Sequence, residues 1–163
     1  MATVFDFKKL RRLINIYAVV QVALVGLLVY VAMNFQAGLA SLGRGELFTK
    51  SIILTLLMQL AMFFPVYKFA SREAVLAIAG MQDGLTPEEM KSQRTKRLIG
   101  DVVKAGVFCF YLVFIMVVAN KSLDRAPKML VMSMIFFNFI LTYLSYFQCF
   151  NFVARREMKL KQA

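Results

Sequence analysis

Four long apolar runs dominate the pattern of the chain, at residues 13–33, 51–67, 102–119 and 129–153. None of the four contains Asp, Glu or His. At a helical rise of ~1.5 Å per residue they would reach roughly 25–38 Å, which matches a ~30 Å hydrocarbon core. The residues do not alternate as they would in a barrel strand, and unpaired backbone groups are costly in lipid. The pattern therefore predicts an all-α fold, a polytopic membrane protein built as a four-transmembrane-helix bundle.

Composition agrees with this class. Hydrophobic residues make up 60% of the 163 residues and charged residues 18%, whereas about a quarter is usual for soluble domains. Basic residues precede the first run, as they do in a secretory signal. However, that run has about twenty residues, against ~7–15 for the apolar part of a signal peptide. We interpret it as an anchor that stays in the mature protein, so that residues 1–163 form a single integral membrane domain.

The basic residues predict an orientation, because Lys and Arg near transmembrane helices are retained on the cytoplasmic side. With both termini inside, fifteen of the 20 Lys and Arg lie in inner segments, and the outer loops hold Arg44, Lys50, Lys121, Arg125 and Lys128. The expected location is a bacterial inner membrane with both termini in the cytoplasm. The net charge of +11 then reflects this topology and an attraction to anionic lipid headgroups, and it requires no nucleic acid as a partner.

Residues 68–101, between the second and third runs, predict a short cytoplasmic helical hairpin. Good helix formers continue from the second run as far as Asp83 and Gly84, where we expect the first arm to end. The second arm restarts at Thr86, which fits an N-cap, with Glu89 at the third helical position of a capping box.

Two interpretations of this hairpin are open. Its arms could pair with each other or with lipid headgroups, or its apolar stripe could dock a partner protein. The stripe consists of Val75, Ile78, Met81, Leu85, Met90 and Leu98. The basic candidates for contact with a partner or with anionic lipid are Arg72, Lys91, Arg94, Lys96 and Arg97.

Uncharged polar residues inside the runs are candidates for contacts between helices, because such groups hydrogen-bond across helices in lipid. The fourth run places four of them on one helical face, at spacings of four, three and four: Asn138, Thr142, Ser145 and Cys149. The second run adds Thr55 and Gln59, and the first adds Gln21. We expect these faces to meet, either as packing contacts or as the lining of a transport pathway.

Two further features concern the shape and surroundings of the helices. Pro65 lies late in the second run, where it predicts a kink. The fourth run carries aromatic residues on nearly every side. Such a helix is either surrounded by other helices or faces lipid, and it could contact partner subunits.

Candidate chemistry is sparse. The chain has no His, and Cys109 and Cys149 are isolated, so we predict no disulfide, no metal site, no haem or other cofactor and no catalytic set. A membrane enzyme would need an acid or nucleophile near an interface, and only Asp101 and Asp124 qualify. Asp101 has Lys104 one turn away, which predicts an ion pair.

The sequence therefore favours a non-catalytic accessory, assembly or scaffold subunit of a larger membrane complex, with protein partners in the membrane or a homo-oligomer. The alternative is a self-associating channel or transporter lined by the polar face of the fourth helix. A membrane enzyme fits the sequence less well.

Overall fold

The computed structural model describes residues 7–81 and 86–162, and four long helices account for most of them. They are α1 (Lys8–Ser41), α2 (Glu46–Ala79), α3 (Pro87–Asn120) and α4 (Arg125–Gln162). All four are long and apolar enough to cross a membrane. The prediction of an all-α protein with four membrane-length helices is therefore confirmed, and it indicates an integral membrane protein.

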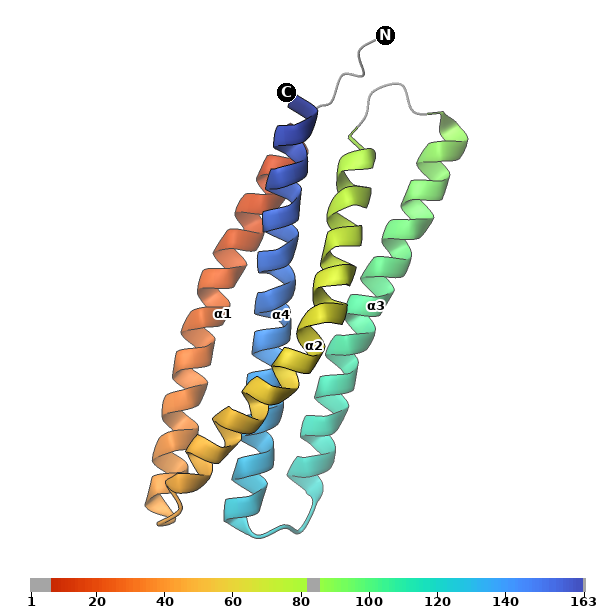
Figure 1. Ribbon diagram of the computed structural model, residues 1–163. Coiled ribbons are helices and arrows are strands. Elements are labelled where there is room, and N and C mark those ends of the chain that lie inside the picture. Colours follow the sequence, from red (N-terminus) through yellow and green to blue (C-terminus); the bar gives the residue numbers. More distant parts are fainter. Residues whose placement is uncertain (1–6, 82–85, 163) are drawn as a thin grey trace.

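The helices run up and down, so that α1 begins and α4 ends at the same end of the bundle (Figure 1). We call this end, where α2 also ends and α3 begins, the terminal end. α4 is the central helix: α1, α2 and α3 all pack against it, while α1 and α3 do not touch each other within the described residues. The aromatic fourth run thus packs in large part against the protein's own helices, with Phe137, Tyr146 and Phe150 buried and Phe152 exposed.

The main core lies towards the terminal end, between α1, α2 and α4. Alanines are part of this core: Ala70 and Ala74 of α2 and Ala154 of α4 are fully buried. Small side chains let helix backbones approach closely, which is how helices gain packing energy in lipid. Larger residues fill the space around them, among them Leu10, Ile14, Ile78 and Phe150.

α2 changes direction partway along its length (Figure 1). Pro65 lies inside this helix, where it cannot donate a backbone hydrogen bond and its ring crowds the carbonyl of Ala61. Because α2 bends, its first half crosses α4 and its second half runs beside α3. The predicted kink in the second apolar run is confirmed.

The connections between helices follow local sequence signals. At the turn from α1 to α2, Gly43 has φ +67°, a left-handed conformation that glycine adopts without penalty. At the start of α3, the Thr86 side chain accepts a hydrogen bond from the Glu89 backbone N–H at 3.3 Å, and Glu89 Oε2 accepts one from the Thr86 N–H at 2.9 Å. The predicted capping box is confirmed. The predicted stop at Asp83 and Gly84 lies outside the described residues, and α2 itself ends at Ala79.

Candidate functional site

The polar residues of α2 and α4 meet at Gln59. Its amide nitrogen donates to Ser145 Oγ at 3.0 Å and to the Leu141 carbonyl at 3.3 Å. Its amide oxygen accepts from Thr142 Oγ1 at 3.3 Å. Both ends of the Gln59 side chain are therefore engaged within the protein, and the three polar side chains form one hydrogen-bonded cluster between the two helices.

α3 joins this cluster through Tyr111, whose hydroxyl lies 3.3 Å from Thr142 Oγ1. Nearer the α1–α2 turn, Asn138 donates to Met58 Sδ at 3.4 Å. Thr55 is only 1% exposed, and its hydroxyl has no hydrogen-bond partner among the described residues. Cys149 is buried as a free thiol in the main core. The polar face of α4 is thus occupied mainly by contacts with α2.

Gln21, the candidate from the first apolar run, lies elsewhere. It borders a groove between α1 and α4 together with Gln148, Asn151 and basic residues of α4. Its amide nitrogen is buried without a partner among the described residues. The sequence grouped Gln21 with Gln59 by residue type, but the two glutamines serve different helix pairs.

A second cluster, of charged residues, joins α2 to α3. Lys104 Nζ lies 2.6 Å from Asp101 Oδ1 on its own helix and 3.4 Å from Glu73 Oε2 on α2. The predicted pair between Asp101 and Lys104 is confirmed. The sequence did not reveal Glu73, whose side chain is 11% exposed, because nothing in its spacing indicates which helix it faces. The three charges leave the cluster with a net charge of −1 when all are ionised.

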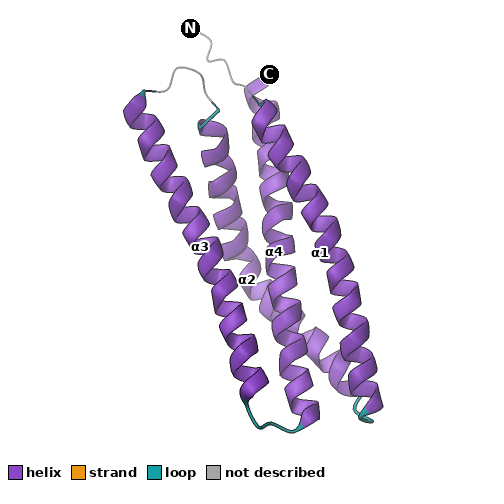
Figure 2. Cartoon of the chain, turned by 180° about the vertical axis from the view of Figure 1, so that it is seen from behind, coloured by secondary structure: helices purple, strands orange, loops and turns teal. Residues whose placement is uncertain are grey.

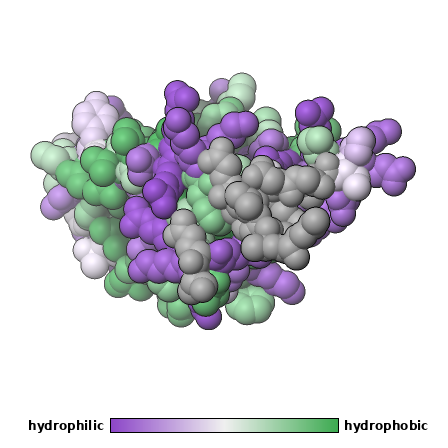
Figure 3. Space-filling view, turned by 90° about the horizontal axis from the view of Figure 1, so that it is seen from above, coloured by the Kyte–Doolittle hydropathy of each residue, from purple (hydrophilic) through white to green (hydrophobic). Residues whose placement is uncertain are grey.

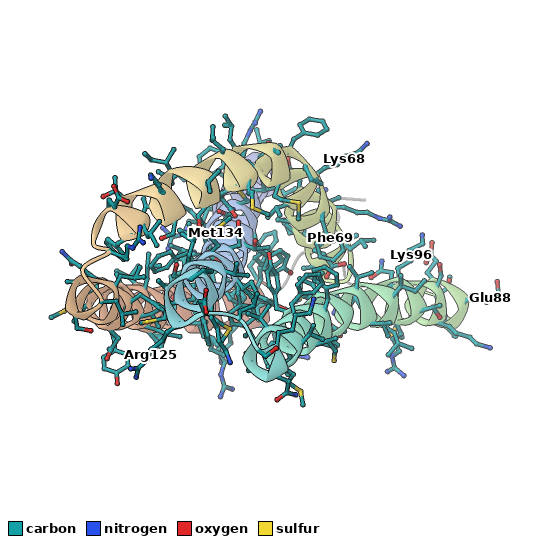
Figure 4. All side chains as sticks on the ribbon, turned by 90° about the horizontal axis from the view of Figure 1, so that it is seen from below. Lys68, Phe69, Glu88, Lys96, Arg125 and Met134 are labelled. Atoms are coloured by element: carbon teal, nitrogen blue, oxygen red, sulfur yellow. The ribbon has the colours of Figure 1, made fainter. Side chains whose placement is uncertain are left out.

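An apolar cavity of about 240 Å³ lies next to this cluster, between α2, α3 and α4. Phe69 faces into the bundle from α2, whereas Lys68 lies on its outer side (Figure 4). The Tyr143 hydroxyl donates to the Lys104 backbone carbonyl at 2.8 Å, and Lys104 Nζ lies 5.8 Å from the centre of the Tyr146 ring. The walls suit a hydrocarbon chain, and the Lys104 ammonium is already paired with two carboxylates.

The basic candidates of the hairpin differ in their surroundings. The Arg97 guanidinium donates to the carbonyls of Leu76 and Ala77, at 3.4 and 3.3 Å. It therefore provides hydrogen bonds to backbone carbonyls in the last turn of α2. The other four candidates are exposed: Arg72, Lys91, Arg94 and Lys96. Lys96 and Glu88 lie on the part of α3 that stands away from α1 and α4 (Figure 4).

The apolar stripe of the hairpin is divided in the structure. Ile78 is buried in the main core and Met81 packs against it. Val75, Met90 and Leu98 are exposed. Leu85 lies outside the described residues. The exposed part of the stripe is therefore concentrated on the first half of α3, beside Lys91, Arg94 and Lys96.

Within the described residues, no group of three or more His, Cys, Asp or Glu is placed to hold a metal ion. Comparison with protein-family models, with curated proteins and with solved structures finds no match for this chain. Its function must therefore be argued from its own residues.

Proposed function

We propose that this chain is a non-catalytic multi-pass membrane protein that serves as an accessory, assembly or scaffold subunit of a larger membrane complex. The observation that carries the proposal is the position of α3. Its buried residues among those described are Gly100 and Val118, and its first half stands apart from α1 and α4 (Figures 1 and 2). We call this first half, residues 87–101, the α3 arm.

The α3 arm combines apolar anchors with positive charge. Leu98 is 62% exposed and Met90 is also exposed, and Lys91, Arg94 and Lys96 flank them. Anchors of this kind on a helix dock into grooves of partner proteins, and basic neighbours favour an acidic rim. The capping box at Thr86 and Glu89 starts the arm as a formed helix, which lowers the entropy lost on binding.

The polar groups inside the bundle support a structural role. Gln59 uses both ends of its amide within the protein, and Lys104 is paired with Asp101 and Glu73. Groups that conduct an ion or transfer a proton must exchange partners during the process. The alternative of a channel lined by α4 has less support, because its polar face would first have to separate from α2.

The proposal places the α3 arm and both termini in the cytoplasm, and the membrane is taken to be a bacterial inner membrane. Support for this orientation comes from the distribution of Lys and Arg, of which only five lie at the end of the bundle assigned to the outside.

The test is site-specific photocrosslinking in native membranes, followed by mild extraction, native gel sizing and mass spectrometry. A photoreactive residue at Leu98 reports on the α3 arm, and one at Val22, which is also exposed, serves as the matched control on α1. We expect Leu98 to yield a discrete adduct with another membrane protein that Val22 does not give. If both positions yield only lipid adducts and the protein migrates alone, the proposal is wrong.

A further inference from the structure

A groove of about 530 Å³ runs between α1 and α4 near the terminal end. Ala18 and Gln21 of α1 form one wall. The other wall belongs to α4 and consists of Gln148, Asn151, Phe152, Arg155, Arg156 and Lys159. The groove does not include residues of the α2–α4 polar cluster or of the α3 arm.

The α4 wall follows from helical spacing. Gln148, Phe152, Arg155 and Lys159 recur at intervals of four, three and four, so they lie on one face of the helix. Along this face the residues change from amide and aromatic to basic in the direction of the terminal end. Hydrophilic side chains gather at that end when the bundle is seen from above (Figure 3). The basic part of the groove therefore lies where the apolar run of α4 gives way to a charged sequence.

Asn151 joins the two helices, and its side chain also suggests that the groove binds a ligand. It is 7% exposed, and its amide nitrogen donates to the Ile14 carbonyl of α1 at 3.4 Å. Its amide oxygen, like the amide nitrogen of Gln21, is buried without a partner among the described residues. Buried polar groups normally have hydrogen-bond partners. The two residues that border the groove therefore carry one donor and one acceptor that the described part of the protein does not use.

These groups define the chemistry of a ligand. Arg155, Arg156 and Lys159 favour an anion, and Arg favours phosphate oxygens in particular. The Gln21 amide nitrogen needs an acceptor oxygen, and the Asn151 amide oxygen needs a donor such as a hydroxyl. Glu157 lies in the same segment but does not line the groove. Ala18 and Phe152 supply apolar surface beside the polar groups.

We propose that this groove binds an anionic phospholipid whose headgroup carries a hydroxyl, such as phosphatidylglycerol. The phosphate lies among Arg155, Arg156 and Lys159. The Gln21 amide nitrogen donates to an ester oxygen of the lipid, and the Asn151 amide oxygen accepts a hydrogen bond from the headgroup hydroxyl. Basic pockets between transmembrane helices bind anionic headgroups in this manner. The site is separate from the basic residues of the α3 arm and does not depend on the proposed subunit role.

The test is native mass spectrometry of the purified full-length protein in detergent with added lipid. The probes are phosphatidylglycerol, phosphatidylcholine of the same acyl chains, and soluble glycerol phosphate. A double variant, Arg155→Gln with Arg156→Gln, removes two charges from the groove. Its matched control, Arg94→Gln with Lys96→Gln, removes the same charge from the α3 arm. Circular dichroism checks that all variants are helical.

The wild-type protein should retain phosphatidylglycerol in preference to phosphatidylcholine. Because each basic residue near a headgroup contributes about fivefold in affinity, the groove double variant should lose on the order of twentyfold, and the arm control should lose much less. Equal losses in the two double variants would show attraction by surface charge and would overturn the proposal. Equal binding of glycerol phosphate would show that the ligand is a soluble phosphate compound, which overturns it as well.

Gln21→Leu provides a second test that leaves the charge unchanged. The variant places an apolar residue on a transmembrane helix, so it should fold. A built site predicts that it lowers the affinity for phosphatidylglycerol, because the Gln21 amide nitrogen is the donor to an ester oxygen of the lipid. An unchanged affinity would show that the buried Gln21 amide does not contact the lipid and would overturn the site as proposed.

Discussion

The carboxylate of Glu73 on α2 occupies the space beside Gly100 of α3 where a side chain would begin. Gly100 is buried, and its missing side chain lets the acid reach Lys104 on the same face of α3. The glycine therefore makes the ion pair between the two helices possible. Elsewhere on α3, Gly106 has open space in the corresponding position.

Gly100→Ala should be less stable than Gly106→Ala. The added methyl group meets the Glu73 carboxylate, the end of a flexible side chain, and displaces it from Lys104, so we expect a cost near the low end of the roughly 1–3 kcal/mol typical of crowding, offset in part by the preference of a helix for alanine. Gly106→Ala is the matched control. It meets no atom and should be neutral or stabilising by up to about 1 kcal/mol, because alanine favours a helix over glycine. Thermal unfolding in detergent measures both. If the two variants behave alike, Glu73 does not depend on the space at Gly100.

The charged cluster can be tested by a double-mutant cycle of Lys104→Met and Glu73→Gln. Both side chains are largely buried. Removing Lys104 takes away the ion-pair partner of Glu73, whereas removing Glu73 leaves Lys104 paired with the exposed Asp101 alone, and the coupling should lie at about 0.5–3 kcal/mol. Asp101→Asn is the control. The Asp101 side chain is 67% exposed, and exposed pairs contribute little. A coupling near zero between Lys104 and Glu73 would contradict the role of the pair in joining α2 and α3.

Features of this structure that are set by residues close together in the sequence could be predicted, and features set by distant residues could not. The apolar runs and the capping motif at Thr86 and Glu89 act over a few residues, and they predicted the helices and the start of α3 correctly. The partners of Glu73 and Arg97 were not accessible, because they depend on how α2 and α3 are rotated about their axes. An apolar run fixes the length of a helix in lipid but leaves its rotation open.

The same reasoning applies to the candidate site. The spacing of Thr142 and Ser145 placed them on one face, and Gln59 contacts both. Whether that face acts in transport stays untested. The groove beside Asn151 was missed because its two walls are far apart in the sequence. The available signal was the basic sequence that follows the fourth run, which we interpreted as a sign of topology and of a general attraction to anionic headgroups.

Gln59→Leu tests the α2–α4 polar cluster. The substitution removes three hydrogen bonds, each worth roughly 0.6 to 2 kcal/mol in a membrane protein, and leaves the Ser145 and Thr142 hydroxyls without that partner. We expect a clear drop in the temperature of unfolding. The control is Thr55→Val, which preserves shape and deletes a hydroxyl that has no partner among the described residues, so it should be neutral or stabilising. Equal destabilisation would mean that the hydroxyl of Thr55 is bonded after all.

The same two variants test the channel alternative. The wild-type protein and both variants are reconstituted into liposomes, and ion or solute flux is measured. A pore lined by this face would lose or change its flux in Gln59→Leu. We expect no flux above that of protein-free liposomes from any of the three proteins. A flux that depends on Gln59 would contradict the subunit proposal and favour self-association.

The α3 arm should be sensitive to acid at its first turn. Hydrogen bonds from the backbone and side chain of Thr86 hold the pKa of Glu89 below its ordinary value of 4.5. A carboxyl whose pKa is lowered by folding stabilises the helix start above its ordinary pKa and loses that effect as pH falls through the lowered value.

Amide hydrogen exchange at Glu89 and Met90 should therefore be slow at neutral pH relative to the intrinsic rate, and this protection should fall below about pH 4. Thr86→Ala should lower the protection of the Glu89 amide at all pH values, because the hydroxyl that accepts its hydrogen bond is lost. Glu88→Gln, which alters a neighbouring acid outside the capping box, should keep the acid response, and losing that response in Glu88→Gln would show that Glu89 is not its source.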